Sequence, residues 1–485
     1  MSVRHLAYVL GIVLLALAAA LAFTAALALV HGDGDAAAFA IATVFVAAAG
    51  LVGYRFGAIR GDLNIREGYA VVSLSWIAIA IGGALPYVFA GTTDSFVAAL
   101  FESASGFTTT GATIFGNIEV LPHGILFWRA LTQWIGGMGI IVLGIAILPV
   151  LGIGGMQLFR AEVPGPTPER LKPRIAQTAK LLWYVYAGLT AMQVALYMLG
   201  DMPAFEAVTH AMTTLSTGGF SPKNASIAAY GPYIQYVTIA FMYLAGINFA
   251  LHYRVLMRSA NPASDPEWRF FTSMLVGATL VMMLLAFGST HGARGFEPAL
   301  RDALFQVVSI TTTTGFVTYD YELWPFGSHF LLVLLMLMGG MAGSTAGGMK
   351  AMRVYVLLRL GLTEVKKSVH PHAVIATRLG RTAIDDATLL NIVGFILLFI
   401  SLFAAGALAM TLLGHDLVTA IGASAATIAN IGPGLGEVGA VDNYGWLDPA
   451  SQGVLIFLMI VGRLEIFTVL LLFHPDLWRR LSWRA

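Results

Sequence analysis

The chain has 485 residues, of which 58% are hydrophobic and only 11% are charged, and its mean hydropathy is +0.80. Soluble proteins carry about twice this share of charged residues, so the composition indicates a polytopic membrane protein. The net charge of +1 gives no sign of nucleic-acid binding, and there is no basic patch interleaved with aromatic residues. Cysteine is absent, which excludes disulfides, thiol chemistry and cysteine-ligated metals.

Two apolar segments begin the sequence, at 6–30 and 36–54, and each is long enough to cross the hydrocarbon core. The first follows Arg4 and His5, an arrangement also found in signal peptides. Its apolar run is longer than the about 7–15 residues of a signal peptide. We therefore interpret it as a retained span, and residues 1–60 as two leading transmembrane helices.

A unit then recurs four times, and each copy contains an apolar span, a short amphipathic run, a Thr/Ser/Gly-rich stretch and a second span. The first spans lie near 69–90, 181–199, 270–288 and 389–413. The second spans lie near 124–150, 233–256, 328–360 and 451–473. The repeats are placed at 61–155, 156–260, 261–365 and 366–485. The sequence thus predicts an all-α polytopic membrane protein with four tandem span–pore helix–filter loop–span repeats.

The Thr/Ser/Gly-rich stretches have the composition of an ion path. They are Thr108-Thr109-Thr110-Gly111, Leu215-Ser216-Thr217-Gly218, Thr312-Thr313-Thr314-Gly315 and Ala429-Asn430-Ile431-Gly432. Glycine permits a backbone that turns carbonyl oxygens toward a common axis. Two residues before each glycine, a side chain offers an oxygen: Thr109, Ser216, Thr313 or Asn430. Because the stretches contain no carboxylate, they predict a path for dehydrated monovalent cations.

An acidic residue precedes each stretch at a similar distance, and these residues are Asp94, Asp201, Glu297 and Asp416. Proline follows closely in two copies, at Pro203 and Pro298. Asp is a strong N-cap and Pro suits the first helical turn, so we predict that each acid begins a short helix ending just before the filter. The C-terminal dipole of such a helix favours a cation. The alternative is outer-loop acids at coincidental spacing.

The distribution of basic residues predicts the orientation in the membrane. Most of the 27 Lys and Arg residues fall on one side of the span model, including the stretches 160–180 and 353–381 and the C-terminal tail. The positive-inside rule assigns that side to the cytoplasm, with both termini and the loops 155–180 and 361–388. Acidic residues on the other face would raise the local cation concentration, unless they are an ordinary solvated loop surface.

The span at 328–360 is too long for one straight crossing, and its middle is rich in glycine between Gly339 and Gly348. Non-helical backbone at membrane depth survives where it lines a cavity or is covered by protein, so we predict a mobile loop beneath the filter. Close helix packing through small residues is the alternative.

Three ionisable residues in or next to the apolar spans also bear on gating. Arg463 stands near the middle of the last span, and Glu465, two residues on, does not share its helix face. We consider two roles for Arg463, a positive barrier facing the ion path and a structural partner of another helix. For Lys350, just below the glycines, snorkelling to the interface is the simplest explanation.

Motifs over nearly the whole chain carry a family resemblance. They lie at 105–113, 133–139, 216–221, 339–350, 430–434 and 462–466. With these motifs the chain resembles the bacterial TrkH family of Trk-type potassium uptake subunits, in the superfamily with KtrB and the plant HKT transporters. The two leading spans resemble TrkH more than KtrB.

The resemblance implies a pseudo-fourfold pore within one chain of the bacterial inner membrane, a homodimer, and control by a cytosolic TrkA-like nucleotide-binding ring on the basic loops. It implies bound K+ and no cofactor in the chain itself. The implied ion-binding residues are Thr109, Thr110, Gly111, Ser216, Thr217, Gly218, Thr313, Thr314, Gly315, Asn430, Ile431 and Gly432. The implied gating residues are Gly339, Gly340, Gly343, Ser344, Thr345, Gly347, Gly348, Lys350 and Arg463. Some plant members carry Ser at the position of Gly111 and favour sodium, so Gly111 favours potassium.

Three functional hypotheses remain at this stage. The leading one is potassium-selective conduction down the electrochemical gradient. The second is obligate K+/H+ or K+/Na+ symport, for which Glu102, Glu206 and His210 are the chief candidate proton carriers. The third is an intramembrane serine hydrolase, suggested by Ser424 in the loose GxSx pattern at 422–425, but no His partner is evident and HExxH is absent. The chain is therefore not predicted to be an enzyme.

Overall fold

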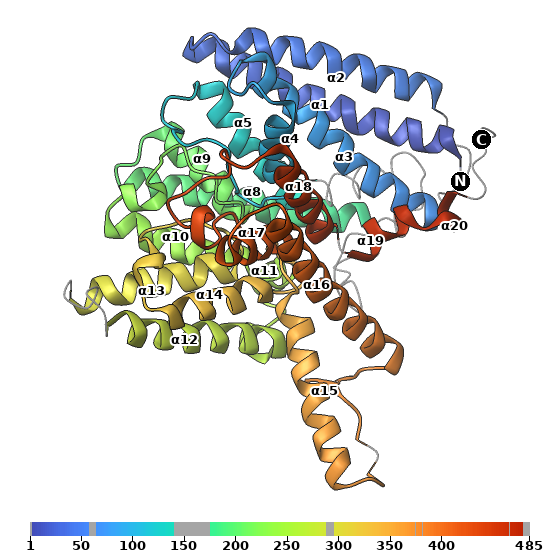
Figure 1. The fold of residues 1–485 in the computed structure, drawn as a ribbon, viewed down its shortest axis with the longest axis vertical. Coiled ribbons are helices and arrows are strands. Elements are labelled where there is room, and N and C mark those ends of the chain that lie inside the picture. Colours follow the sequence, from blue (N-terminus) through green and yellow to red (C-terminus); the bar gives the residue numbers. More distant parts are fainter. Residues whose placement is uncertain are drawn as a thin grey trace.

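The computed structural model describes residues 2–57, 65–139, 175–287, 295–373, 375–380, 382–464 and 466–478, and they are almost entirely helical (Figure 1). One short antiparallel hairpin, β1 (Arg378–Leu379) and β2 (Thr382–Ala383), interrupts the helices. Several predictions lie outside the described residues: the end of the span 124–150, most of the loop 155–180, Glu465, and the C-terminal basic tail.

The two leading helices are α1 (Val3–His31) and α2 (Ala36–Phe56), and they lie side by side at one edge of the molecule (Figure 1). Their backbones approach closely at Gly11, where a Cβ would overlap the backbone of Tyr54. The connecting turn then reaches the pore repeats, because Asp35 accepts a hydrogen bond from Ile125 N at 3.1 Å. The two predicted leading helices are therefore present, and they are fastened to the first repeat.

Each repeat begins with a long apolar helix and continues with a short pore helix, as predicted. The long helices are α3 (Ile65–Phe89), α8 (Ile175–Leu199), α12 (Pro266–Phe287) and α16 (Asp386–Leu412). The pore helices are α4 (Phe96–Phe107), α9 (Ala204–Leu215), α13 (Phe296–Thr311) and α17 (Leu417–Ala429). Short 3₁₀ turns follow in the loops beyond the pore helices, at Ser226–Ala229, Tyr321–Leu323 and Gly436–Val438. A further 3₁₀ turn, Pro262–Ser264, precedes α12.

The second helix changes its course or its helix type in every repeat, and the predicted second spans at 233–256 and 451–473 each consist of more than one helical piece. In the first repeat α5 (His123–Trp134) passes into a π-helix, Ile135–Gly139. In the second, α10 (Pro232–Ala245) and α11 (Phe249–Leu256) meet at 99°. In the third, residues 339–350 separate α14 (Phe326–Met338) from α15 (Ala351–Val369). The fourth contains α18 (Pro449–Arg463), α19 (Ile466–Leu470), a 3₁₀ turn (Leu471–Phe473) and α20 (Pro475–Trp478).

Glycines at these breaks explain why the second helices do not continue straight. A Cβ on Gly136, Gly246 or Gly462 would overlap, respectively, Phe107, Thr312 or Ile428 at the C-terminal end of a pore helix. The breaks therefore bring backbone against the pore-helix ends, an approach that a side chain would block. Among the described residues, six helices are long and apolar enough to cross a membrane, or eight if the two bent pairs each count as one span.

Candidate ion pathway and gate

The four pore helices end in the same backbone conformation. The residue after each C-cap, or the C-cap itself in α17, is left-handed: φ is 54° at Thr109, 54° at Thr217, 57° at Thr313 and 57° at Asn430. This conformation is unusual for any residue with a side chain and is strained for a β-branched threonine. Its recurrence at four equivalent positions shows that the four loops are structural copies of one another.

A shared hydrogen bond fixes the register of these loops. The backbone N–H of the next residue donates at 2.8 Å to a carbonyl five residues earlier: Thr110 to Ser105, Gly218 to Thr213, Thr314 to Ser309 and Ile431 to Ala426. Together with the left-handed residue, this bond defines a Schellman termination, which satisfies carbonyls that the helix end leaves without partners. Each pore helix thus stops at a fixed point relative to the loop that follows.

The register of the second loop differs by one residue from the register predicted from the sequence. Gly218 corresponds to Thr110 in its hydrogen bonding, and the glycine that is left-handed like Gly111 is Gly219, with φ of 76°. The residue equivalent to Thr109 is accordingly Thr217, whereas Ser216 is the C-cap of α9. The sequence alone suggested Gly218, the first of two consecutive glycines, as the counterpart of Gly111, but only Gly219 adopts the positive φ.

The four loops form a closed ring in sequence order. A Cβ on Gly111 would overlap the carbonyl oxygen of Gly218, and one on Gly219 would overlap that of Thr314. A Cβ on Gly315 would lie 2.9 Å from Pro433 Cδ. Gly432 N closes the ring by donating to the Thr110 carbonyl at 2.5 Å. Each loop thus contacts the next in a pseudo-fourfold arrangement, and these glycines have no room for a side chain.

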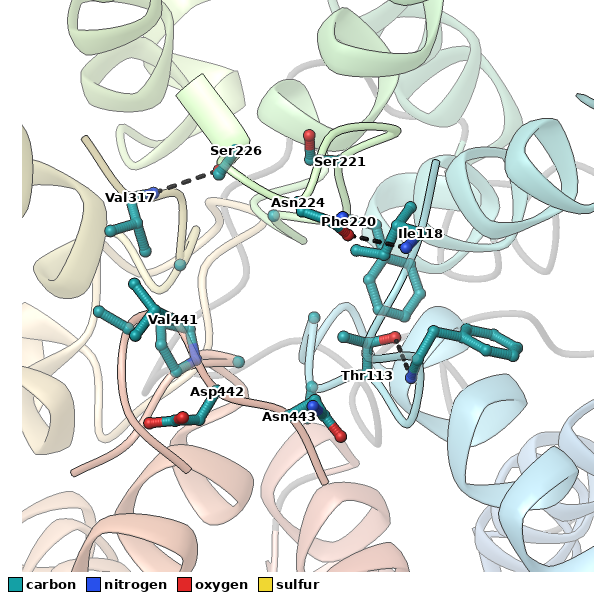
Figure 2. Close-up of a pocket in the computed structure, with 18 of the residues that line it drawn as sticks. Thr113, Ile118, Phe220, Ser221, Asn224, Ser226, Val317, Val441, Asp442 and Asn443 are labelled. Atoms are coloured by element: carbon teal, nitrogen blue, oxygen red, sulfur yellow. Dashed lines mark hydrogen bonds between the residues drawn. The ribbon is translucent and has the colours of Figure 1, made fainter. Parts of the chain in front are cut away.

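A cavity of about 110 Å³ lies over this ring, and Gly111, Gly219, Gly315 and Gly432 all line it. Figure 2 shows residues of all four repeats around the open space, with Asp442 near its edge. Hydrogen bonds join the rim between repeats, from Ile118 N to Asn224 Oδ1 at 2.7 Å and from Val317 N to Ser226 Oγ at 3.3 Å (Figure 2). The ring therefore opens into a vestibule that is built jointly by the four repeats.

The side chains at three of the four predicted positions have different environments. Thr313 Oγ1 accepts from Gly347 N at 2.7 Å, and Ser216 Oγ donates back to Thr213 O at 3.2 Å. Asn430 Nδ2 donates to Thr110 Oγ1 at 3.0 Å. The structure thus places Ser216 against its own helix, because it is the helix cap and not the left-handed residue.

The glycine-rich segment 339–350 is non-helical and mostly buried directly beneath the ring. Thr345 Oγ1 donates to the carbonyl of Leu215 at 3.0 Å, where the second pore helix ends. Gly347 contacts the end of the third pore helix through Thr313 and packs against the carbonyl of Ala429 at the end of the fourth. We call residues 339–350 the intramembrane loop. The predicted interruption is present, and it contacts three of the four pore-helix ends.

Arg463 joins this loop to the first repeat. Its Nη1 donates to Thr345 O at 2.7 Å, and its Nη2 donates to Gly136 O at 2.9 Å and Gly137 O at 3.1 Å. Lys350 is 7% exposed and its Nζ donates to Ala346 O within the loop. Snorkelling therefore does not describe Lys350, because the loop folds back over its ammonium group.

One anchor of the loop was missed by sequence reasoning. Glu267, at the start of α12, is 5% exposed, and its Oε1 accepts from Ala342 N at 2.7 Å and Met352 N at 3.1 Å. A single carboxylate thus contacts the first half of the intramembrane loop at Ala342 and the first turn of α15 at Met352, just after the loop ends. A glutamate in the first turn of a helix ordinarily serves the helix dipole, so nothing local in the sequence distinguished it.

Only one of the four predicted acidic caps is present. Asp416 accepts from Val418 N at 2.9 Å and Thr419 N at 3.1 Å and begins α17. In the first repeat Ser95 is the cap, accepting from Ala98 N, so Asp94 is one residue too early. Asp201 lies in a turn before α9, with φ of 62°. Glu297 is inside the first turn of α13, where it pairs with Arg301 at 3.0 Å.

The fold and the ring define a class: an integral membrane protein in which four pore-loop repeats of one chain surround a common axis. Comparison with known proteins places the chain within this class. The family model of TrkH, described as a cation transport protein, matches residues 35–480. The chain belongs to the TrkH family.

Individual relatives match over the full length. The Trk system potassium uptake protein TrkH of Escherichia coli (strain K12) is 40% identical over 490 residues, covering 99% of this chain and 100% of the relative. TrkH of Salmonella typhimurium is 39% identical over 488 residues, with the same coverage of 99% and 100%. The crystal structure of the potassium transporter TrkH from Vibrio parahaemolyticus has a TM-score of 0.89 and 36% sequence identity, covering 99% of this chain and 100% of that one.

Proposed function

We propose that this chain takes up potassium across the bacterial inner membrane, conducting K+ selectively through the ring of four loops. The closed ring of Gly111, Gly219, Gly315 and Gly432 carries the proposal, because it brings the backbones of four repeats around one point. The names of the relatives support potassium as the ion. Backbone and side-chain oxygens of the four stretches replace the hydration shell of K+, and the chain itself needs no cofactor.

Gating is assigned to the intramembrane loop and Arg463. The loop lies beneath the ring and is held there by the three carbonyl contacts of the Arg463 guanidinium and by Glu267. Non-helical backbone at this depth is stable only while it is covered. We infer that ions pass when the loop moves aside, and that a cytosolic nucleotide-binding ring docked on the basic loops drives this movement.

Homodimer formation is supported by the helix α15, which extends away from the rest of the molecule (Figure 1). Its exposed apolar residues recur with heptad-like spacing: Leu358 (53% exposed), Leu362 (60%), Val365 (64%) and Val369 (69%). Such a stripe on a projecting helix is the pattern of a helix–helix seam. A second copy of this chain is the proposed occupant. By the positive-inside rule, we infer that the basic stretch 353–381, which contains most of α15, and both termini face the cytoplasm.

Channel-like conduction is favoured over coupled transport because the candidate proton carriers are engaged in fixed contacts. Glu102 is ion-paired with Arg129 at 2.8 Å, and Glu206 accepts from Tyr230 Oη at 2.6 Å. The ring nitrogens of His210 lie 2.9 Å from Glu206 O and 3.0 Å from Ser221 Oγ.

Ser424, the residue that suggested a serine hydrolase, donates to Phe403 O at 2.7 Å at a close helix crossing. This contact supports a role in helix packing over a role in catalysis.

Uptake of rubidium or potassium into proteoliposomes containing this chain alone tests the proposal, with sodium and pH gradients varied separately. Uptake that follows the potassium gradient alone, with sodium excluded, is the expected result. A requirement for a proton or sodium gradient would replace conduction by symport. If flux appears only after a cytosolic regulatory ring is added, the pore remains and the gating assignment gains support.

A further inference from the structure

The pore helices of the first three repeats carry a polar residue at one equivalent position. Counted back from the left-handed residue, Glu102, His210 and Gln306 occupy the same place in α4, α9 and α13, whereas α17 has Ala423. Each polar side chain contacts the non-helical segment that follows the filter loop of its own repeat, here called the filter exit. Glu102 contacts Thr113, His210 contacts Ser221, and Gln306 donates to Tyr319 O. The first repeat is distinct because its residue is charged.

Glu102 forms a fully buried ion pair with Arg129 of α5. The distance from Nε to Oε1 is 2.8 Å, and the two side chains are 0% and 1% exposed. The carboxylate also accepts two hydrogen bonds from the filter exit, from Thr113 Oγ1 at 3.0 Å and from Ile114 N at 2.9 Å. A buried charge with this many partners fixes geometry strongly, because each alternative position leaves it unpaired.

Arg129 extends this network into the second repeat. Its Nη1 donates to Ser221 O at 3.0 Å, and its guanidinium carbon lies 4.2 Å from the centre of the Phe220 ring. Through Nη2 it also donates to Thr113 Oγ1 at 3.1 Å. Because His210 contacts the hydroxyl of Ser221, one connected set of buried groups holds the exits of both filter loops.

One turn further along α5, Gln133 clamps the second loop itself. Its Nε2 donates to Gly218 O at 2.6 Å, and its Oε1 accepts from Phe220 N at 3.0 Å. Arg129 and Gln133 stand four residues apart on one face of the helix. The second helix of repeat 1 therefore positions the filter of repeat 2, across the boundary between repeats.

We propose that Glu102 and Arg129, with Gln133, are positioning residues for ion selectivity, which hold the filter loops of repeats 1 and 2 at the spacing that fits K+. The inference rests on the proposed function, because it concerns the same ring. The contacts that hold the loops differ around the ring. The fourth loop has Ala423 at the position of Glu102, and there Tyr444 Oη donates a hydrogen bond of 2.8 Å to Gly432 O.

The test compares Glu102→Gln, which keeps the shape and removes the charge, with the exposed-pair control Glu297→Gln in α13. Glu297 also pairs with an arginine, Arg301 of the same pore helix, but it is 54% exposed and does not line the cavity over the ring. The K+/Na+ selectivity ratio is measured by competition in rubidium uptake. We expect Glu102→Gln to lower the ratio by about tenfold or more, and Glu297→Gln to leave it unchanged.

A second variant separates positioning from unpaired charge. Glu102→Gln/Arg129→Gln removes both charges, so any loss of selectivity that persists in it comes from lost positioning. A double variant that folds, as judged by size exclusion and thermal unfolding, and keeps the parent ratio would overturn the proposal.

A readout without conduction distinguishes failure of this inference from failure of the proposed function. The rise in unfolding temperature with added K+ is compared with that for Na+, because an ion that binds the folded state stabilises it. If the parent protein carries no flux but its unfolding temperature rises more with K+ than with Na+, the proposed conduction fails. The inference can then still be decided by comparing this preference between the parent and Glu102→Gln. Loss of the preference in Glu102→Gln supports the inference, and an unchanged preference overturns it.

Discussion

The guanidinium of Arg463 donates a hydrogen bond of 2.7 Å to the carbonyl of Thr345, so the last membrane helix is tied directly to the intramembrane loop. The same guanidinium binds the carbonyls of Gly136 and Gly137, in the π-helical end of α5. These contacts agree with the structural role first considered for this residue, and the role of a positive barrier facing the ion path stays a prediction.

Replacing Arg463 by Gln is expected to increase ion flux through the protein alone, by about tenfold, because three charge-assisted bonds to carbonyls are lost or weakened. Rubidium uptake into proteoliposomes measures the effect. Arg359→Gln is the matched control, because Arg359 lies on the projecting helix α15 and contacts Tyr355 of the same helix. Equal flux in parent and Arg463→Gln would show that the bond does not hold the loop closed.

Glu267 gives a graded test of the loop anchor. Glu267→Gln retains an oxygen that accepts hydrogen bonds, whereas Glu267→Ala leaves Ala342 N and Met352 N without this partner. We expect Glu267→Ala to lower the free energy of unfolding by about 2–4 kcal/mol and to raise flux, with Glu267→Gln in between. Thermal unfolding and rubidium uptake on the same preparations measure both effects. The reverse order of the two variants would contradict the anchor.

The register of the second loop predicts unequal effects at two adjacent glycines. Gly219→Ala places a methyl group against the carbonyl of Thr314 at a positive φ, so it should abolish potassium selectivity or flux. Gly218→Ala requires no positive φ and meets a side chain, the amide of Gln133, in place of backbone, so it should lower selectivity less than Gly219→Ala although it disturbs that contact. Selectivity measured for both variants decides the register. If Gly218→Ala proves the more damaging, the original alignment holds.

The N-cap of α17 predicts a pH-dependent contribution to stability. Hydrogen bonds from Thr419, and then from Val418 N, hold the pKa of the Asp416 carboxyl below its usual 3.8. Since the pKa is lower in the folded state, the stabilisation is present above pH 3.8 and is lost as the pH falls through the lowered value. Asp416→Ala should lower the free energy of unfolding by about 1 kcal/mol at neutral pH, and Asp416→Asn much less.

Chemical unfolding at neutral and acidic pH measures this effect in detergent. The difference between parent and Asp416→Ala should shrink only at strongly acidic pH. Asp94→Ala serves as the control, because Ser95 and not Asp94 caps α4. A comparable loss in Asp94→Ala would restore the idea that the acids cap all four helices.

The repeat architecture was predictable because its signals are local. Hydropathy located the long helices, and glycine and threonine marked the loops that follow the pore helices. The register of the second loop was not predictable, because Gly218 and Gly219 are chemically identical and differ only in the φ that the folded ring imposes. The cap at Ser95 could not be distinguished from one at Asp94, because serine and aspartate are both favourable N-cap residues.

The breaks in the second helices have a different origin. No proline lies between α10 and α11, and the break follows from tertiary contacts, in which the carbonyl of Gly246 accepts from Met341 N at 2.9 Å. Likewise Glu102 and Arg129 are far apart in sequence, and Glu267 is separated from both of its partners. Such pairings join segments that come together only when the helices pack, so a sequence read segment by segment cannot reveal them.

The intramembrane loop belongs to the third repeat alone, while the ring above it uses all four. The gate that we propose is this single element, so it would open by one local displacement, without the concerted motion of four equivalent subunits that a symmetric tetramer requires. A regulator therefore needs to supply coupling free energy to one loop and its few anchors. Because the four pore units are fused into one chain, a change in one repeat is enough to control ion flux. The other three repeats need not move in the same way.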